Sequence, residues 1–249
     1  MTDQPDARRG EASDDDTGTS SGDDDLARSF SQFARTVQQH QDPEATLVEI
    51  VGSAIALIPG CDEASISLVI GRQRVRSYAH SNDLPRAVDA LQESLNQGPC
   101  LDAAYEHETV RVTDMASETR WPLFCEAALA AGAAGMLSIQ LFVDDDNLGA
   151  LNLFSRTADA LNDESEHVGL MFAAHAAVAY AAARQQAAMT RVVSTREVIG
   201  QAQGILMERH KLTASQAFAL LVRVSQHRNA KLRQVAESLV LSGKLELPA

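Results

Sequence analysis

Cysteine and aromatic residues are scarce in this chain of 249 residues. It has three cysteines, none in a CxxC spacing, and aromatic side chains make up 4% of its residues. This usage argues against both a disulfide framework and a zinc site. No apolar run approaches the roughly 20 residues that a transmembrane helix needs, and the N-terminal residues lack the apolar core of a signal peptide. We therefore expect a cytoplasmic protein without a membrane partner.

Motifs for catalysis and metal binding are also lacking. The chain contains no GxxxxGK[ST] phosphate loop, no GxSxG elbow and no GxGxxG turn, and its histidines show neither HxH nor HExxH spacing. We therefore expect no catalytic residues, no metal site and no enzymatic activity.

The charge of the chain is unevenly distributed. Residues 1–25 hold nine acidic and two basic side chains, residues 26–186 hold 21 and ten, and residues 187–249 hold four and nine. The overall charge of −13 argues against nucleic acid as a partner, but the basic C-terminal part is typical of a single module that meets a polyanion. On charge alone, a surface gradient without function explains the asymmetry equally well.

The N-terminal part is predicted to be a tail followed by helices. Residues 1–25 have few apolar side chains, so we expect a disordered acidic tail that ends in aspartates at an N-cap position. After the tail, Leu26, Phe30, Phe33 and Val37 recur at helical spacing. A second helix is predicted to begin at Asp42-Pro43 and to stop before Pro59-Gly60.

Residues 26–186 as a whole are predicted to form one α+β domain. Alternating apolar patterns and turn residues predict strands at 64–70, 74–80, 110–113, 135–143 and 148–155. Helical patterns fall at 84–95, 101–106 and 122–131. Short strands joined as hairpins favour an antiparallel sheet flanked by helices.

A long alanine-rich helix is predicted to follow the sheet. It opens at residues 163–166 and has no proline to stop it before Gln186. The alanines at 173–188 and the pair Phe30 and Phe33 predict packing against a second copy, and hence a homodimer. Packing within one domain is the alternative.

Residues 187–249 are predicted to form an all-α three-helix bundle. Helices are expected at about 195–209, 214–228 and 230–242, each with one apolar stripe. Ser194 with Glu197 and Thr213 with Gln216 have the spacing of capping boxes. Asn229 is predicted to cap the third helix, and Gly243 to end it.

The C-terminal segment resembles the ANTAR family, the RNA-binding domains of bacterial transcription antiterminators. The resemblance rests on REVIGQAQGILM at 196–207, Ala217-Phe218, SQHRNAKL at 225–232 and Val235-Ala236. Residues 40–185 resemble a GAF domain through the order of their elements and through Gly98-Pro99-Cys100, Arg120-Trp121-Pro122 and LGALN at 148–152. The chain thus resembles a GAF and ANTAR domain-containing antitermination regulator.

The resemblance implies binding to nascent mRNA that carries paired hairpins, which prevents a terminator hairpin from forming. The candidate RNA-binding residues are Arg196, Gln203, Arg209, Ser225, Asn229, Lys231 and Arg233. Basic side chains would contact phosphates, while polar ones would read unpaired bases. Ser225 and Asn229 could instead cap or buttress a turn, and the family often has lysine where this chain has Gln203.

The GAF resemblance implies a sensor whose ligand is an unidentified small molecule. The candidate ligand-binding residues are Tyr78, Cys100, Arg120 and Trp121. Cys100 could equally be a small buried residue, and a lone tryptophan is often part of a core. The alternative function is a GAF sensor whose C-terminal helices bind DNA or a protein partner, although duplex DNA is not the partner that the resemblance predicts.

Overall fold

The computed structural model describes residues 20–39, 42–70, 74–105, 108–143 and 146–245. The chain divides into two compact units, Met1–Ala181 and Ala182–Ala249. Among the described residues, no helix has the length and hydropathy of a membrane span.

The first unit is built on an antiparallel sheet of five strands in the order β2-β1-β5-β4-β3. The strands are β1 (Glu63–Ile70), β2 (Arg74–His80), β3 (Thr109–Val112), β4 (Gly135–Val143) and β5 (Asp146–Ser155). Each matches a predicted strand to within two residues at either end, and the predicted antiparallel pairing is confirmed. Residues 71–73, which join the first two predicted strands as a hairpin, lie outside the described residues.

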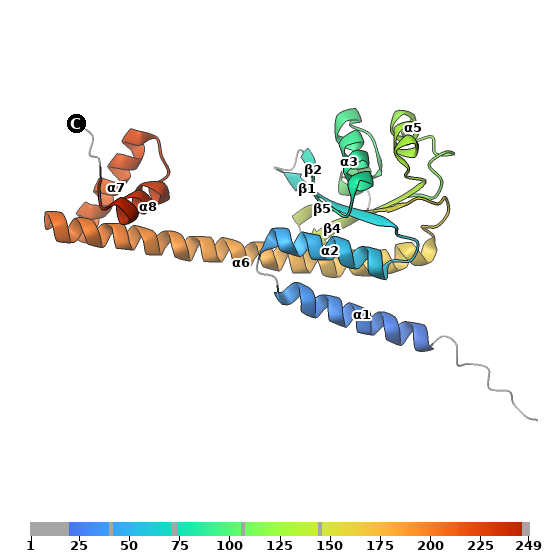
Figure 1. The fold of residues 1–249 in the computed structure, drawn as a ribbon, viewed down its shortest axis with the longest axis horizontal. Helices are drawn as coiled ribbons and strands as arrows, with labels where there is room; N and C mark the ends of the chain where they lie inside the picture. Colours follow the sequence, from blue (N-terminus) through green and yellow to red (C-terminus); the bar gives the residue numbers. More distant parts are fainter. Residues whose placement is uncertain (1–19, 40–41, 71–73, 106–107, 144–145, 246–249) are drawn as a thin grey trace, which may run out of the picture. The chain divides into compact units, whose positions relative to one another are not determined.

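Helices cover both faces of this sheet (Figure 1). The helices over one face are α2 (Pro43–Leu57) and the first part of α6 (Asp163–His210), and α1 (Ser20–Gln39) packs on their outer side; those over the other face are α3 (Asp83–Leu95), α4 (Pro99–Tyr105) and α5 (Pro122–Ala131). β5 contributes side chains to the hydrophobic cores on both faces of the sheet, because successive side chains of a strand point to opposite faces. Leu151 and Leu153 pack in the first core, whereas Ala150 and Phe154 pack in the second.

α1 packs against its own unit through aromatic residues. The Phe33 side chain is 4% exposed, and its ring centroid lies 4.6 Å from that of Phe172 on α6. Ala173 and Ala177 of α6 are buried in the same core. The residues expected to lie between two copies are thus largely used inside one protomer, which corrects the basis of that prediction.

The start of α1 also differs from the prediction. The helix begins at Ser20, so the aspartates at 23–25 lie within it rather than at its N-cap. The part of the expected disordered tail that precedes Ser20 lies outside the described residues.

The second unit is a bundle of the end of α6, α7 (Ala214–Arg228) and α8 (Leu232–Ser242). Its buried residues are Ala202, Leu206, Ala217, Leu221, Val224, Val235, Ala236 and Leu239. The predicted capping box of Thr213 and Gln216 is confirmed at the start of α7, and Gly243 ends α8 as predicted. The fold class, a GAF-like α+β domain followed by a long helix and a helical bundle, is confirmed.

Two predicted helix starts in this unit are wrong. Ser194 caps nothing, because α6 continues through it and the Ser194 hydroxyl donates to the Arg191 carbonyl inside the helix at 3.1 Å. Asn229 does not begin the third helix either. It ends α7 in the left-handed conformation, and α8 begins after Lys231.

Candidate nucleic-acid interface

The turn between α7 and α8 is closed by its own hydrogen bonds. Asn229 has φ 49° and ψ 39°, and its N–H donates to the Gln226 carbonyl at 3.2 Å. The Ser225 hydroxyl donates to the Ala230 carbonyl at 2.6 Å, and the Ala230 N–H donates back to the Ser225 carbonyl at 3.0 Å. The turn is therefore a preformed surface rather than a loose loop.

This turn presents Asn229 and Lys231 to solvent. Both residues are exposed, whereas Ser225 is half-buried with its hydroxyl hydrogen already used. The backbone N–H of Lys231 donates to Gln234 Oε1 at 3.3 Å, which leaves its ammonium group outside the capping arrangement. Arg233 is half-buried, and its Nε pairs with Glu237 Oε1 at 2.7 Å, so part of its charge is neutralised locally.

Two other candidates hold the bundle together. The half-buried Gln203 of α6 donates through Nε2 to the Ala214 carbonyl at 3.0 Å, at the start of α7. The Arg209 guanidinium donates to the carbonyl of Gly243, the residue that ends α8. The Arg209 contact satisfies a carbonyl at the C-terminal end of α8, where carbonyls lack partners within the helix.

The RNA-binding candidates therefore fall into groups. Ser225, Asn229, Lys231 and Arg233 lie together at the start of α8, whereas Arg209 lies at the end of that helix. Arg196 is exposed on α6. The structure does not bring all seven candidates into one patch.

Two exposed glycines on α6 were missed as candidate residues. A Cβ added at Gly200 or Gly204 would meet nothing within 4 Å. Because glycine within a helix costs about 1 kcal/mol relative to alanine, two glycines beside open space are candidates for a close approach by a partner. Arg196, Gly200 and Gly204 follow one another at intervals of four, so the sequence itself carried this signal.

In the first unit, two of the four ligand candidates are in contact. The Arg120 guanidinium lies 4.5 Å from the centroid of the Trp121 ring, which is 7% exposed and belongs to the second core. Hydrogen bonds from Arg120 to the Glu118 carboxylate hold the pKa of that group at about 2. Arg120 also donates to the Arg111 carbonyl at 2.9 Å.

The other two ligand candidates lie in different surroundings. Cys100 is buried in the same core as Trp121, and burial raises the pKa of its thiol to about 12, so the thiol is protonated at neutral pH. Tyr78 lies on the edge strand β2 and is 47% exposed. The surroundings of Cys100 therefore fit the alternative interpretation, in which Cys100 is a small buried residue.

A buried polar cluster between α3 and the sheet was also missed. The Asp89 carboxylate accepts hydrogen bonds from the Ser77 hydroxyl at 2.5 Å, from Asn152 Nδ2 at 3.3 Å and from Gln92 Nε2 at 3.5 Å. Burial raises the Asp89 pKa to about 6. The signal in the sequence was an aspartate one residue after Val88, on the apolar face of an amphipathic helix.

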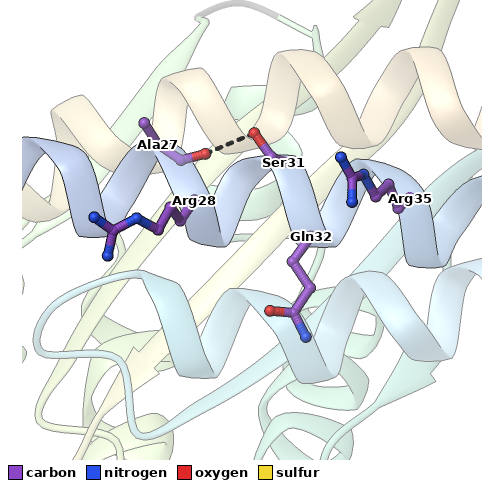
Figure 2. A pocket seen from close by; sticks show the side chains of 5 residues that line it. All are labelled: Ala27, Arg28, Ser31, Gln32 and Arg35. Carbon is purple, nitrogen blue, oxygen red and sulfur yellow. Dashed lines mark hydrogen bonds between the residues drawn. The ribbon is translucent and has the colours of Figure 1, made fainter.

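Two hollows lie elsewhere on this unit. One runs over α1 and is lined by Ala27, Arg28, Ser31, Gln32 and Arg35, as Figure 2 shows. All five belong to one helix, so this hollow is an open surface. The other lies where the Arg111 guanidinium pairs with Asp163 at 2.7 Å, at the start of α6. Within the described ranges, no group of three or more His, Cys, Asp or Glu residues could hold a metal ion.

Comparison with known proteins assigns both units to families. A family model described as ANTAR domain matches residues 187–240, and one described as GAF domain matches residues 40–181, more than half of the chain. No curated protein matches the chain.

Solved structures resemble the chain at low sequence identity. The free methionine-R-sulfoxide reductase of Neisseria meningitidis aligns with a TM-score of 0.52 and 19% identity, over 72% of this chain and 98% of that one. The GAF domain of a phosphoenolpyruvate-protein phosphotransferase from Coxiella burnetii gives 0.51 and 17%, over 66% and 96%. A Stigmatella aurantiaca phytochrome photosensory core module gives 0.58 and 11%, over 88% and 47%. At these identities the likeness shows the fold alone.

Proposed function

We propose that this chain is a signal-controlled antitermination regulator that binds hairpins in nascent mRNA. The premise is that the chain belongs to the GAF domain family and carries an ANTAR domain at residues 187–240. Both domains are regulatory rather than catalytic, and an ANTAR domain implies RNA binding. Binding of paired hairpins would keep a competing terminator hairpin from forming.

The observation that carries the proposal is the exposed Lys231 at the preformed α7–α8 turn. Its ammonium group is available to a phosphate, and the neighbouring Asn229 amide can donate to and accept from the edge of an unpaired base. Lys231 lies in the part of the chain where basic residues outnumber acidic ones. A turn that is already ordered loses little conformational freedom when RNA binds.

The sensing half of the proposal concerns the first unit. We place the signal in this unit, with Arg120 and Trp121 as the residues best arranged to meet a small molecule, since they combine a cation with an aromatic ring. Cys100 lies in the same core as Trp121, and Tyr78 lies on the edge strand.

A homodimer is part of the proposal. Met189, Val192 and Val193 of α6 are 65%, 52% and 60% exposed, and none of the hydrophobic clusters formed by the described residues includes them. Three large apolar side chains exposed within two turns of a helix favour pairing with the same helix of a second copy.

Replacing Lys231 tests the RNA-binding proposal. For Lys231→Ala we expect weaker binding of the full chain to a hairpin RNA, with the slope of log K against log salt smaller by about 0.7 if the ammonium group contacts a single-stranded phosphate. The melting temperature should stay unchanged, because exposed substitutions shift stability by no more than about 0.5 kcal/mol.

The matched control is Lys244→Ala, an exposed lysine beyond the other end of α8, which should leave hairpin affinity unchanged. Unaltered affinity of Lys231→Ala, at an unaltered melting temperature, would remove this turn from the interface. If duplex DNA of equal phosphate count competes as well as hairpin RNA, the result would favour the alternative of a DNA-binding module.

A further inference from the structure

The Asp89 cluster contains a buried carboxyl group that no cation balances among the residues the structure describes. The Asp89 side chain is 3% exposed, and the hydrogen bonds to it come from neutral side chains, those of Ser77, Ser65, Asn152 and Gln92. A buried carboxylate that only neutral donors surround keeps an unbalanced charge, which costs free energy when ionised. Such a group is sensitive to the uptake of a single proton.

The groups around Asp89 come from β2, α4, β1 and β5. His80 of β2 lies with Nε2 3.9 Å from Asp89 Oδ2, and the Cys100 thiol of α4 is the other titratable group nearby. β1 and β5 contribute the neutral side chains of Ser65, Ser67 and Asn152. Burial, followed by the charge of Arg86, lowers the pKa of His80, so the imidazole is neutral at pH 7.

A continuous hydrogen-bonded chain leads from Asp89 toward solvent. Ser77 Oγ lies 2.5 Å from Asp89 Oδ2 and 2.7 Å from His80 Nε2, and the His80 side chain is 17% exposed. A proton that binds His80 Nδ1 allows Nε2 to pass its proton to Ser77, and Ser77 to pass its own to Asp89. The products are a neutral carboxylic acid, an intact hydroxyl and a neutral imidazole that carries its proton on Nδ1.

We propose that Asp89, Ser77 and His80 form a proton switch that sets how firmly α3 is held against the sheet of the first unit. Both states of the chain are fully hydrogen-bonded, and only the direction of donation reverses. Opening of α3 exposes Asp89 to water, where the ionised form is favoured, so the proton-bound form keeps α3 closed. As a statement about regulation, the proposal rests on the sensor role of this unit, but it concerns α3 itself and not RNA binding.

The sign of the pH dependence follows from linkage. Burial raises the Asp89 pKa from 3.8 to about 6, so the closed state binds the proton more tightly than the open one. The closed state, in which α3 packs against the sheet, is therefore most stable at low pH. Its extra stability relative to the open state is lost as the pH rises from about 4 to about 6. Between pH 5 and pH 7.5, the equilibrium constant for opening α3 should rise about tenfold.

The test measures two properties of the full chain. The carboxyl carbon of Asp89, followed by NMR, should titrate near pH 6, and the protection factors of α3 amides should fall about tenfold between pH 5 and pH 7.5. Asp89→Asn should abolish the pH dependence of the protection factors. The control Glu93→Gln, which removes an exposed carboxylate from the same helix, should retain it.

Ser77→Ala supplies a second variant in case Asp89→Asn does not fold. It removes a donor to the ionised carboxylate, so the Asp89 midpoint should move above that of the unsubstituted chain. The proposal would be overturned if Asp89 titrated near pH 4 or if the protection of α3 amides did not depend on pH. It would also be overturned if the pH dependence persisted in Asp89→Asn, or if Ser77→Ala left the Asp89 midpoint unmoved. None of these readouts uses RNA, so they are independent of the hairpin experiment.

Discussion

At the residue scale, the Ser225 hydroxyl separates two interpretations of the α7–α8 turn. Its hydrogen is bonded to the Ala230 carbonyl at 2.6 Å, which favours a buttress over a contact to RNA. Ser225→Ala should lower the free energy of unfolding by about 1 kcal/mol, because a half-buried carbonyl loses its donor. Thermal or urea unfolding measures this loss, with the exposed Ser238→Ala as the control.

Hairpin affinity of Ser225→Ala, measured well below its melting temperature, should equal that of the unsubstituted chain. A loss of affinity without a loss of stability would instead assign this hydroxyl to RNA. Neither sequence spacing nor residue type separates the two roles, because serine suits a turn and a base contact equally well.

At the element scale, helix ends were harder to predict than helices. The apolar periodicity located α7 and α8, and the pairing of strands followed from hairpin patterns. Asn229 was assigned to the wrong helix, since asparagine suits both an N-cap and the left-handed residue that ends a helix. Ser194 has the spacing of a capping box, yet a serine within a helix can donate to the carbonyl of the preceding turn instead.

Substitution of Asn229 tests its role in ending α7. Glycine adopts the φ of 49° found at this position without strain, whereas the Cβ of alanine is sterically strained there. We expect Asn229→Gly to leave stability nearly unchanged and Asn229→Ala to lower it by about 1 kcal/mol. Equal melting temperatures of the two variants would contradict the left-handed assignment. Hairpin affinity of Asn229→Gly then reports what the amide alone contributes to binding.

Glycines of α6 provide a second prediction at this scale. Gly200→Ala and Gly204→Ala should each raise stability by about 1 kcal/mol, because the added methyl groups meet open space. The matched contrast is Gly169→Ala in the same helix, where the new Cβ would lie 2.6 Å from Ile139 Cδ1 and should destabilise the first unit. Unfolding curves compare the three, and destabilisation by either of the first two would refute the open-space argument.

At the scale of the whole molecule, the proposed dimer depends on the exposed apolar side chains of α6. Val192→Asp should shift the chain toward the monomer in sedimentation at tens of micromolar, because a carboxylate between paired helices is desolvated without a partner. Leu241→Asp, at an 87% exposed residue of α8, is the matched control and should leave association unchanged. A monomeric unsubstituted chain at that concentration would refute the dimer.

The candidate sites were only partly predictable from the sequence. The basic end of the chain and its motifs located the bundle, and the structure then assigned Gln203 and Arg209 to contacts that hold the helices together. Those contacts join residues of different helices, so no local sequence pattern predicts them. For the Asp89 cluster, the aspartate on the apolar face of α3 was a local signal, but its partners on β2 and β5 lie far from it in the sequence and could not be predicted.

The state of the thiols has a practical consequence. Cys61, Cys100 and Cys125 are all free and buried, and burial raises the pKa of each. Thiolate is the species that attacks maleimides, so the folded chain should react slowly at neutral pH and at three positions once unfolded. A cysteine introduced at the exposed Leu241 would then accept one spin label or fluorophore per chain, without removal of the native cysteines.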